Sequence, residues 1–445
     1  MKIVTLSPEQ FDKFAQNHRY RNYYQSSSYG NVMVKFGYNV HYLGIINELN
    51  KLIGATLIMY KEIFMNNKVA YAPRGILFNY EDEDQVKEMT KKIKNLLSKQ
   101  GFMLLRMDPY IPENIKDQDG NLINFNNQAP KIIENIQKAG FSYKGKTKFF
   151  ETEKPRWEAL VLLNRDDGEI FSKFDKSTKT KIKKAINFGI EVFRDSEKDI
   201  NTLYKFVKKK SPNPLAFYKE MCKNFKQNIE IYYAVLSTET FTINTRRILE
   251  QEQEKNNKLN ILIQDMSLDR KTRNDFLTQK MQSDKLLNTY KNNIVLATDL
   301  LKQYPKGIKI AAAMVITYDN AAYVFVDGFN DEYRPLNPNY LLKWYMIQDY
   351  NSRGFKYINL NAIAGEFQEK NKYTELNETK LGYNTTITEY IGEFDIVLNS
   401  LSYNLYKSFN KDKWFNLSFL LLKHKNININ NIDKQKKELH SSSLI

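Results

Sequence analysis

Cysteine and histidine are scarce in this chain of 445 residues. The one cysteine, Cys222, excludes an internal disulfide. The four histidines (His18, His41, His424 and His440) are scattered along the sequence, so none of them has the neighbours that a zinc site needs. We therefore expect no metal centre and no chemistry that depends on one.

The chain also lacks the short motifs of common nucleotide and acyl chemistry. It has no nucleophile elbow, no phosphate-binding Gly-Lys-Thr loop and no glycine fingerprint for a dinucleotide. These absences favour a reaction whose substrates bring their own reactivity, while the protein positions them, removes a proton and stabilises developing charge. We expect no cofactor.

Long apolar runs are missing as well. The N-terminal residues MKIVTLSPEQ contain no apolar signal region, and the longest apolar runs, near 311–316 and 419–422, are far too short to span a bilayer. We therefore expect a cytoplasmic protein. A net charge of +16 and a pI near 9.3 favour a polyanionic partner, which could be nucleic acid, a phosphate-rich substrate or the anionic face of a membrane.

The order of hydrophobic patterns predicts an α/β (α+β) fold with an internal duplication. In the first 150 residues, the expected elements are a helix at 7–18, strands at 40–48, 52–62 and 68–78, a helix at 81–100 and a strand at 102–108. A polar-aromatic segment, 26–39, separates the first helix from the strands.

The same order recurs in the second half, with strands at 229–236, 308–317 and 321–329, a helix at 337–353 and a strand at 355–363. Gly101-Phe102 and Gly354-Phe355 stand at equivalent places, which favours duplication of one unit of about a hundred residues. Chance similarity of two helix ends is the alternative.

An insertion interrupts the second unit. Residues 237–304 contain no glycine and no proline, and apolar side chains recur there at heptad spacing, namely Leu259, Leu262, Met266, Leu287, Tyr290, Ile294, Ala297 and Leu301. This pattern predicts an antiparallel coiled-coil hairpin with its reversal at 268–275. Its exposed basic residues include Arg246, Arg247, Arg270, Lys271 and Arg273. They suit contact with a long polyanion such as RNA, and a solvated arm is the alternative.

A second basic segment has six lysines within residues 173–184, at the start of a helix that ends at Gly189. Clustered lysines at a helix start suit phosphates, although most charge runs are simply solvated.

Five motifs together point to a known family. They are YAPRG (71–75), RMDPY (106–110), KTKIKKAINFGI (179–190), LNETKLGY (376–383) and EYIGEFD (389–395). With the duplicated units and the inserted hairpin, the chain resembles the Fem family of aminoacyl-tRNA-dependent peptidyltransferases from residue 1 to about 410. The resemblance implies transfer of an amino acid from aminoacyl-tRNA to the side-chain amine of the peptidoglycan stem peptide, on a lipid-linked or UDP-linked muramyl pentapeptide.

The resemblance also implies a domain layout of two tandem GNAT-like domains. The first is expected at 1–150, completed by C-terminal strands at about 390–412, and the second at 151–236 with 307–389. The hairpin arm occupies 237–306, and the polar residues 424–445 are expected to form a mobile tail.

Roles for single residues follow from the same resemblance. Lys380 stands where the family has a lysine that stabilises the negative charge on the carbonyl oxygen, and Asp108 where an aspartate binds the acceptor amine or takes its proton. Glu389 is the third catalytic candidate, with Glu393 beside it. The substrate-binding candidates are Lys35 (for the precursor's diphosphate), Arg74, Lys181, Tyr218, Tyr323 and Tyr383.

Without the resemblance, three of these residues have plainer interpretations. Lys380 would be a flexible surface lysine, Asp108 part of an Asp-Pro turn, and Lys35 a solvent-facing strand lysine.

Two other functions stay open. The first is an acyl-CoA-dependent GNAT N-acyltransferase, which needs a glycine-rich turn at a helix start to hold the pyrophosphate; neither 78–85 nor 329–340 supplies one. The second is a non-catalytic tRNA-binding protein that works through the arm, which predicts tRNA binding without transfer.

Overall fold

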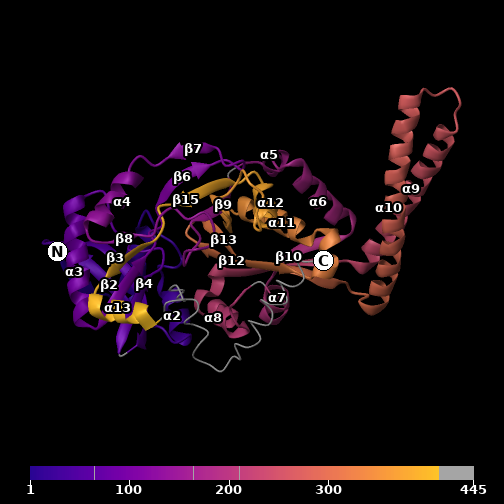
Figure 1. Ribbon diagram of the computed structural model, residues 1–445. Coiled ribbons are helices and arrows are strands. Elements are labelled where there is room, and N and C mark those ends of the chain that lie inside the picture. Colours follow the sequence, from indigo (N-terminus) through magenta and orange to yellow (C-terminus); the bar gives the residue numbers. More distant parts are fainter. Residues whose placement is uncertain (65, 164, 210, 410–445) are drawn as a thin grey trace.

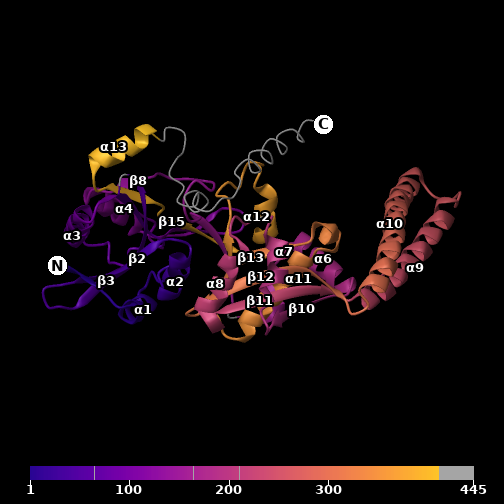
Figure 2. The ribbon, with the colours of Figure 1, turned by 90° about the horizontal axis from the view of Figure 1, so that it is seen from below.

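The computed structural model describes residues 1–409 apart from 65, 164 and 210 (Figure 1). Two β-sheets lie next to each other in the body, and a pair of long helices extends away from the second sheet (Figures 1 and 2). This confirms the predicted mixture of helices and strands. Among the described residues, no helix combines the length and the apolar character that crossing a bilayer requires. The expected tail at 424–445 lies outside the described residues.

The first sheet has the strand order β1-β2-β3-β4-β5-β16-β8. Its strands are β1 (Lys2–Thr5), β2 (Asn39–Ile46), β3 (Leu52–Phe64), β4 (Asn67–Ala72), β5 (Phe102–Met107), β16 (Phe394–Val397) and β8 (Ser142–Tyr143). Neighbours pair antiparallel except β4 and β5, which are parallel because the helix α3 (Glu83–Lys99) crosses between them.

The second sheet has the order β10-β11-β12-β13-β14-β9-β15-β6-β7. Its strands are β10 (Ile190–Asp195), β11 (Ile229–Leu236), β12 (Ile308–Tyr318), β13 (Ala321–Phe329), β14 (Tyr357–Ala362), β9 (Trp157–Leu162), β15 (Thr386–Tyr390), β6 (Pro112–Lys116) and β7 (Leu122–Phe125). From β10 to β15 the pairing repeats that of the first sheet, with one parallel pair, β13 and β14, around α11 (Pro338–Ser352). This repeat agrees with the predicted duplication.

The remaining helices are α1 (Pro8–Asn17), α2 (Ser27–Lys35), α4 (Ala129–Lys138), α5 (Asp167–Ser172), α6 (Lys176–Asn187), α7 (Ile200–Val207), α8 (Leu215–Phe225), α9 (Thr238–Ile263), α10 (Arg270–Gln303), α12 (Thr374–Leu381) and α13 (Ser400–Phe409), with 3-10 turns η1 (Lys226–Asn228) and η2 (Asp331–Leu336). Local chemistry sets several ends. Ser7 and Gln10 form a capping box at α1, and Asp82 caps α3. Gly101 and Gly354 follow α3 and α11 with φ of 80° and 75°, a conformation that glycine adopts without a steric penalty.

One apolar core joins the two halves. Tyr29 and Val32 on α2 belong to the same buried cluster as Phe217 and Met221 on α8. Segment 26–39 was predicted without a helix, yet most of it forms α2, because Ser26 caps the helix and its apolar face packs on this shared core. Lys35 therefore lies on a helix, and its interpretation as a strand residue was wrong.

The sheets do not divide the chain at residue 150. β6 and β7 come from the first 150 residues but extend the second sheet beyond β15, whereas β16 returns to the first sheet between β5 and β8. The domain limits proposed from the sequence stay a prediction, and they need to allow for this exchange of strands.

The insertion forms two antiparallel helices, α9 and α10, that project from the body (Figure 1). The chain reverses between Ile263 and Arg270, so the reversal predicted at 268–275 was placed too late. Asp269 starts the second helix by accepting hydrogen bonds from the Lys271 and Thr272 amides at 2.8 and 3.0 Å. The expected heptad does not reach the tip, where Leu262 is 42% and Met266 88% exposed.

Candidate active site

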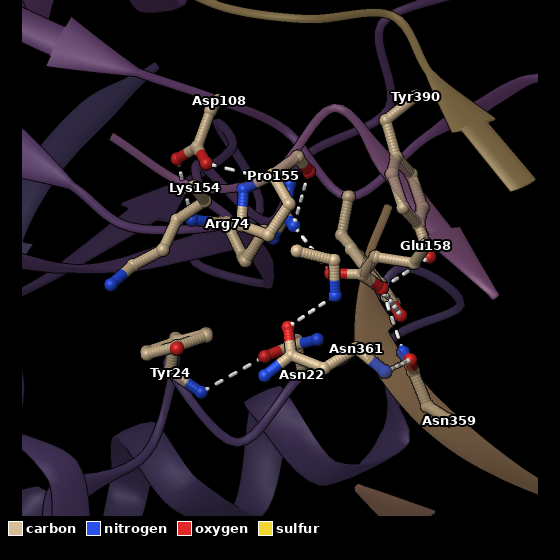
Figure 3. Close-up of polar contacts among 12 residues, drawn as sticks. Asn22, Tyr24, Arg74, Asp108, Lys154, Pro155, Glu158, Asn359, Asn361 and Tyr390 are labelled. Carbon is tan, nitrogen blue, oxygen red and sulfur yellow. Dashed lines mark hydrogen bonds and ion pairs between the residues drawn. The ribbon is translucent and has the colours of Figure 1, made fainter. Parts of the chain in front are cut away.

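Two chain segments cross between the sheets side by side. One follows β5 into β6, and the other joins β15 to β16; the Ile391 amide donates to the Ile111 carbonyl at 3.0 Å. Polar side chains from both segments and from β9 and β14 converge at this junction (Figure 3). The exchange of strands is therefore what assembles a site from residues that lie far apart in the sequence.

Asp108 follows the last residue of β5 and is only 3% exposed. Its Oδ1 accepts hydrogen bonds from the Tyr71 hydroxyl at 2.9 Å and the Arg74 amide at 2.8 Å. Its Oδ2 lies 3.5 Å from Arg74 Nη1 and accepts no hydrogen bond within the described part of the chain. Burial raises the Asp108 pKa to about 6, against the opposing effect of Arg74. This carboxylate can therefore exchange a proton near neutral pH.

Arg74 fixes the geometry around Asp108. Its Nη2 donates to Glu158 Oε1 at 2.7 Å and to the Pro155 carbonyl at 2.8 Å. Its guanidinium lies 5.1 and 4.9 Å from the ring centroids of Tyr110 and Tyr390, which stack on each other with their centroids 4.4 Å apart. Arg74 is buried with both carboxylates, so it is held by charge and by stacking at once.

Glu158 is a structural anchor on β9. Its Oε2 accepts hydrogen bonds from Tyr110, Tyr390 and Asn359, at 3.1, 3.0 and 2.7 Å. With Arg74 on its other oxygen, this carboxylate is fully engaged by neighbours. It is therefore suited to holding the site together and not to receiving a proton.

A small cleft opens beside Glu158. Its lining residues are Asn22, Tyr23, Tyr24, Pro155, Glu158, Tyr323, Val324, Asn359 and Asn361. The cleft has a volume of about 20 Å³, which is room for about one water molecule. Side chains must therefore move before a substrate can enter.

Lys154 places a cation next to Tyr24, one of the residues that line the cleft. Its Nζ lies 4.1 Å from the centroid of the Tyr24 ring and forms no ion pair with any carboxylate in the described part of the chain. Figure 3 shows its side chain between Asp108 and Tyr24. Burial alone would lower the Lys154 pKa, but Tyr24, Tyr29 and Asp108 outweigh it and raise that pKa.

Lys380 lies at the carboxyl end of β14, close to the same cleft. It is on α12, is 7% exposed, and its Nζ donates to the Ala362 carbonyl at 2.6 Å. Asn377 holds the helix there by bonding both the amide and the carbonyl of Ala364. Burial lowers the Lys380 pKa to about 8, although Asp327 acts in the opposite direction. The interpretation as a flexible surface lysine was therefore wrong.

Comparison with known proteins identifies the family. A model described as the FemAB family matches residues 6–411. The chain belongs to this family. It is 22% identical over 427 residues to the aminoacyltransferase FemA of Staphylococcus epidermidis RP62A, a match that covers 93% of this chain and all of that protein. FemA of Staphylococcus aureus N315 is also 22% identical, over 422 residues, with 93% of this chain and 99% of that protein covered.

A solved structure shows that the fold is shared. The crystal structure of FemX superposes with a TM-score of 0.68 at 16% identity, and covers 91% of this chain and 99% of the FemX chain. These findings confirm the resemblance drawn from the five sequence motifs.

Glu389, the third catalytic candidate, is not among the residues that line the cleft, and its catalytic role stays a prediction. That side chain pairs with Arg156 at 3.0 Å and accepts a hydrogen bond from Asn114 at 2.6 Å, in a buried network that also holds Glu113. Glu393 lies in a second network with Arg106 at 3.0 Å, and burial raises its pKa to about 7. Glu389 lies within β15, where strand pairing turns it toward Arg156, and Glu393 lies in the segment between β15 and β16.

Of the predicted substrate-binding residues, Arg74 and Tyr323 lie at the site. Tyr323 lines the cleft, and its hydroxyl lies 3.1 Å from that of Tyr357. Tyr218 is fully buried on α8 and donates to Ser211 Oγ, and Lys35 is exposed at the end of α2. Neither of these two lines the cleft.

Lys181 and Tyr383 lie together at a different place. Lys181 donates to the Tyr340 hydroxyl at 2.9 Å, and the fully buried Tyr383 donates to the Tyr340 carbonyl at 2.9 Å.

The predicted tRNA contacts are spread along the hairpin. Arg246 and Arg247 are exposed on α9, whereas Arg270, Lys271 and Arg273 start α10 at the tip. At 1.5 Å per residue, about 25 Å of helix separates the two groups. They do not form one cluster.

Sequence reasoning missed Glu158 and Lys154. Glu158 had a usable signal, because it is the one acidic residue within WEALVL, a strand whose other residues are mostly apolar. Lys154 had none: it is one of many lysines in a basic chain, and only the fold places it beside Asp108.

Proposed function

We propose that this FemAB-family protein transfers an amino acid from aminoacyl-tRNA to the side-chain amine of a peptidoglycan stem peptide. The relatives' description as aminoacyltransferases supports this reaction class. The observation that carries the proposal is that a buried carboxylate with an unsatisfied oxygen, Asp108, and a buried ammonium, Lys380, both lie near Glu158: Asp108 shares Arg74 with Glu158, and the Glu158 charge acts on Lys380.

The acceptor amine binds at Asp108. Its N–H donates to Oδ2, the oxygen that accepts no hydrogen bond from the described residues. Arg74 holds the carboxylate in place from the side of Oδ1, through its backbone amide. As the amine nitrogen attacks, Asp108 takes its proton, which a pKa of about 6 permits at neutral pH.

The donor ester is already activated, so no covalent enzyme intermediate is required. The amine nitrogen forms a bond to the ester carbonyl carbon, and the carbonyl oxygen becomes negatively charged. Lys380 donates to that oxygen, because its ammonium has three N–H groups and Ala362 uses one of them. The carbonyl then re-forms as the bond to the ribose oxygen of tRNA breaks, and that oxygen leaves with the proton that Asp108 took from the amine.

The proposed function extends to the domains, the hairpin arm and the acceptor substrate. We infer that the two sheets belong to two GNAT-like domains, that α9 and α10 form a coiled-coil arm, and that the acceptor is a lipid-linked or UDP-linked muramyl pentapeptide. The net charge of +16 supports both a tRNA partner and peripheral contact with the inner face of the membrane.

The test is transfer of labelled amino acid from a pool of charged tRNAs to muramyl pentapeptide. Lys380→Met removes the proposed oxyanion donor, and we expect it to lower kcat by a factor of about 10²–10³. Lys370→Met is the matched control, because this exposed lysine lies on the loop before α12 and not at the cleft. Wild-type protein that binds charged tRNA but yields no branched product with either precursor would refute the catalytic assignment and favour a tRNA-binding protein.

A further inference from the structure

A wide, open cavity lies away from the cleft, on the surface of α6. It has a volume of about 650 Å³ and is lined by Lys176, Ser177, Thr180, Lys181, Lys184, Pro335 and Asn337. Six of these seven side chains are polar or cationic, and none is acidic. The wall thus offers ammonium, hydroxyl and amide groups and no negative charge.

The positive charge of this cavity is not neutralised locally. Lys176 and Lys184 form no ion pair with the described residues, and the Lys181 ammonium bonds a neutral hydroxyl. Acidic side chains at the start of α6 and on the neighbouring elements η2 and α12 have partners of their own. Asp175 caps the first turn of α6, and Asp331 and Glu375 both bind Arg334. An anion that enters the cavity therefore meets three ammonium groups without a competing carboxylate in its wall.

The cavity is connected to Lys380 by direct contacts. The Asp175 amide donates to the Gly382 carbonyl at 3.0 Å, so the start of α6 rests on the end of α12, two residues beyond Lys380. A side chain at Gly382 would lie within 2.2 Å of Thr178 Oγ1, which shows how closely the two helices approach. Lys181 and Tyr383 are linked through Tyr340, as described above.

The position of α6 also relates the cavity to the arm. In Figure 1, α6 lies between the junction of the two sheets and the hairpin of α9 and α10. The cavity thus lies on the side of the Lys380 site that faces the arm.

We propose that this α6 cavity binds backbone phosphates of the tRNA next to its acylated 3′ end. This inference rests on the proposed function, since it names where the donor substrate is held. Lys176 and Lys184 are eight residues apart, which spans about 12 Å of helix axis. Lysines spread over that length suit successive phosphates along a nucleic-acid strand better than one compact diphosphate. Contacts with phosphates position the strand but do not depend on its base sequence.

The experiment measures binding of uncharged tRNA to the full chain over a range of salt concentrations. The variant is Lys176→Gln/Lys181→Gln/Lys184→Gln. The logarithm of the binding constant falls as the logarithm of the salt concentration rises, and each phosphate contact on a single strand adds about 0.7 to the steepness of that fall. We therefore expect the slope of the triple variant to be less steep by about 2. Circular dichroism and thermal melting check that the variant is folded.

A neighbouring pair of lysines supplies the matched control. Lys183 and Lys184 are both exposed on α6, but only Lys184 lines the cavity. We expect Lys184→Gln to weaken tRNA binding and lower the salt slope, and Lys183→Gln to leave both close to the wild-type values.

The possible outcomes distinguish failure of the cavity proposal from failure of the proposed function. Equal effects of Lys183→Gln and Lys184→Gln, or an unchanged slope in the triple variant, would overturn the proposal. A raised KM for UDP-linked precursor with unchanged tRNA binding would also overturn it, and would assign the cavity to the precursor's diphosphate. Cavity-dependent tRNA binding without any transfer would support the cavity and reject the proposed function.

Discussion

The pKa values of Asp108 and Lys380 predict a narrow pH optimum for the transfer reaction. Asp108 must be ionised to take the proton, and burial raises its pKa to about 6, so the rate falls as the pH drops below that value. Lys380 must be protonated to stabilise the oxyanion, and burial lowers its pKa to about 8, so the rate falls as the pH rises above that value. The charged groups that act on Lys380 are Asp327, Lys343 and Glu158.

The expected profile of kcat/KM is bell-shaped with its maximum near pH 7. One pH unit beyond each limb, at about pH 5 and pH 9, the rate is about tenfold lower. The assay follows labelled branched precursor at each pH and subtracts spontaneous hydrolysis of the aminoacyl ester, which is measured without protein.

Two variants test which residue causes the acid limb and which causes the alkaline limb of the pH profile. Lys380→Met should lower the plateau and abolish the alkaline limb while the acid limb stays near pH 6. Asp108→Asn should abolish transfer, because an amide cannot accept the proton. A wild-type profile that is flat between pH 5 and pH 9, or an alkaline limb that persists in Lys380→Met, would refute the assignment of these two groups.

Two further predictions concern the buried cations. Arg74→Met leaves Asp108 and Glu158 without their shared counter-charge, so we expect a loss of about 3–5 kcal/mol in the free energy of unfolding, measured by urea denaturation. The exposed Arg165→Met serves as control and should change stability by less than about 0.5 kcal/mol; an equal loss in both variants would contradict the role of Arg74. Lys154→Met removes a cation that lowers the Asp108 pKa, so the acid limb of kcat/KM should move to higher pH, and a limb that does not move would show that Lys154 is electrostatically remote.

Elements whose ends are set locally could be predicted well from the sequence. The helix α3 starts after its cap at Asp82 and ends at Lys99, shortly before Gly101, as expected, and the hairpin of β2 and β3 lies where alternating apolar residues place it. These signals depend on neighbours within a few residues, so they can be read without knowing the fold. Segment 26–39 was missed because its helix depends on packing against α8, which is distant in the sequence.

The candidate site could be predicted only in part from the sequence, for the same reason. The motif around Lys380 could be recognised, but its burial follows from α12 resting on the loop after β14. Glu389 and Glu158 are both acidic residues in short strands, and the sequence does not distinguish them. Strand pairing does, because it places Glu158 beside Arg74 and turns Glu389 toward Arg156.

The sequence by itself thus determined the family, the alternation of helices and strands, the inserted hairpin and the excess of positive charge. Each of these depends on composition or on short-range periodicity. Only the tertiary structure decided which charged groups lie near the cleft, because two segments exchange between the sheets and bring Asp108, Lys154 and Glu158 close to one another. It also decided which lysines of α6 line a cavity, since the contacts with η2 and α12 orient that helix.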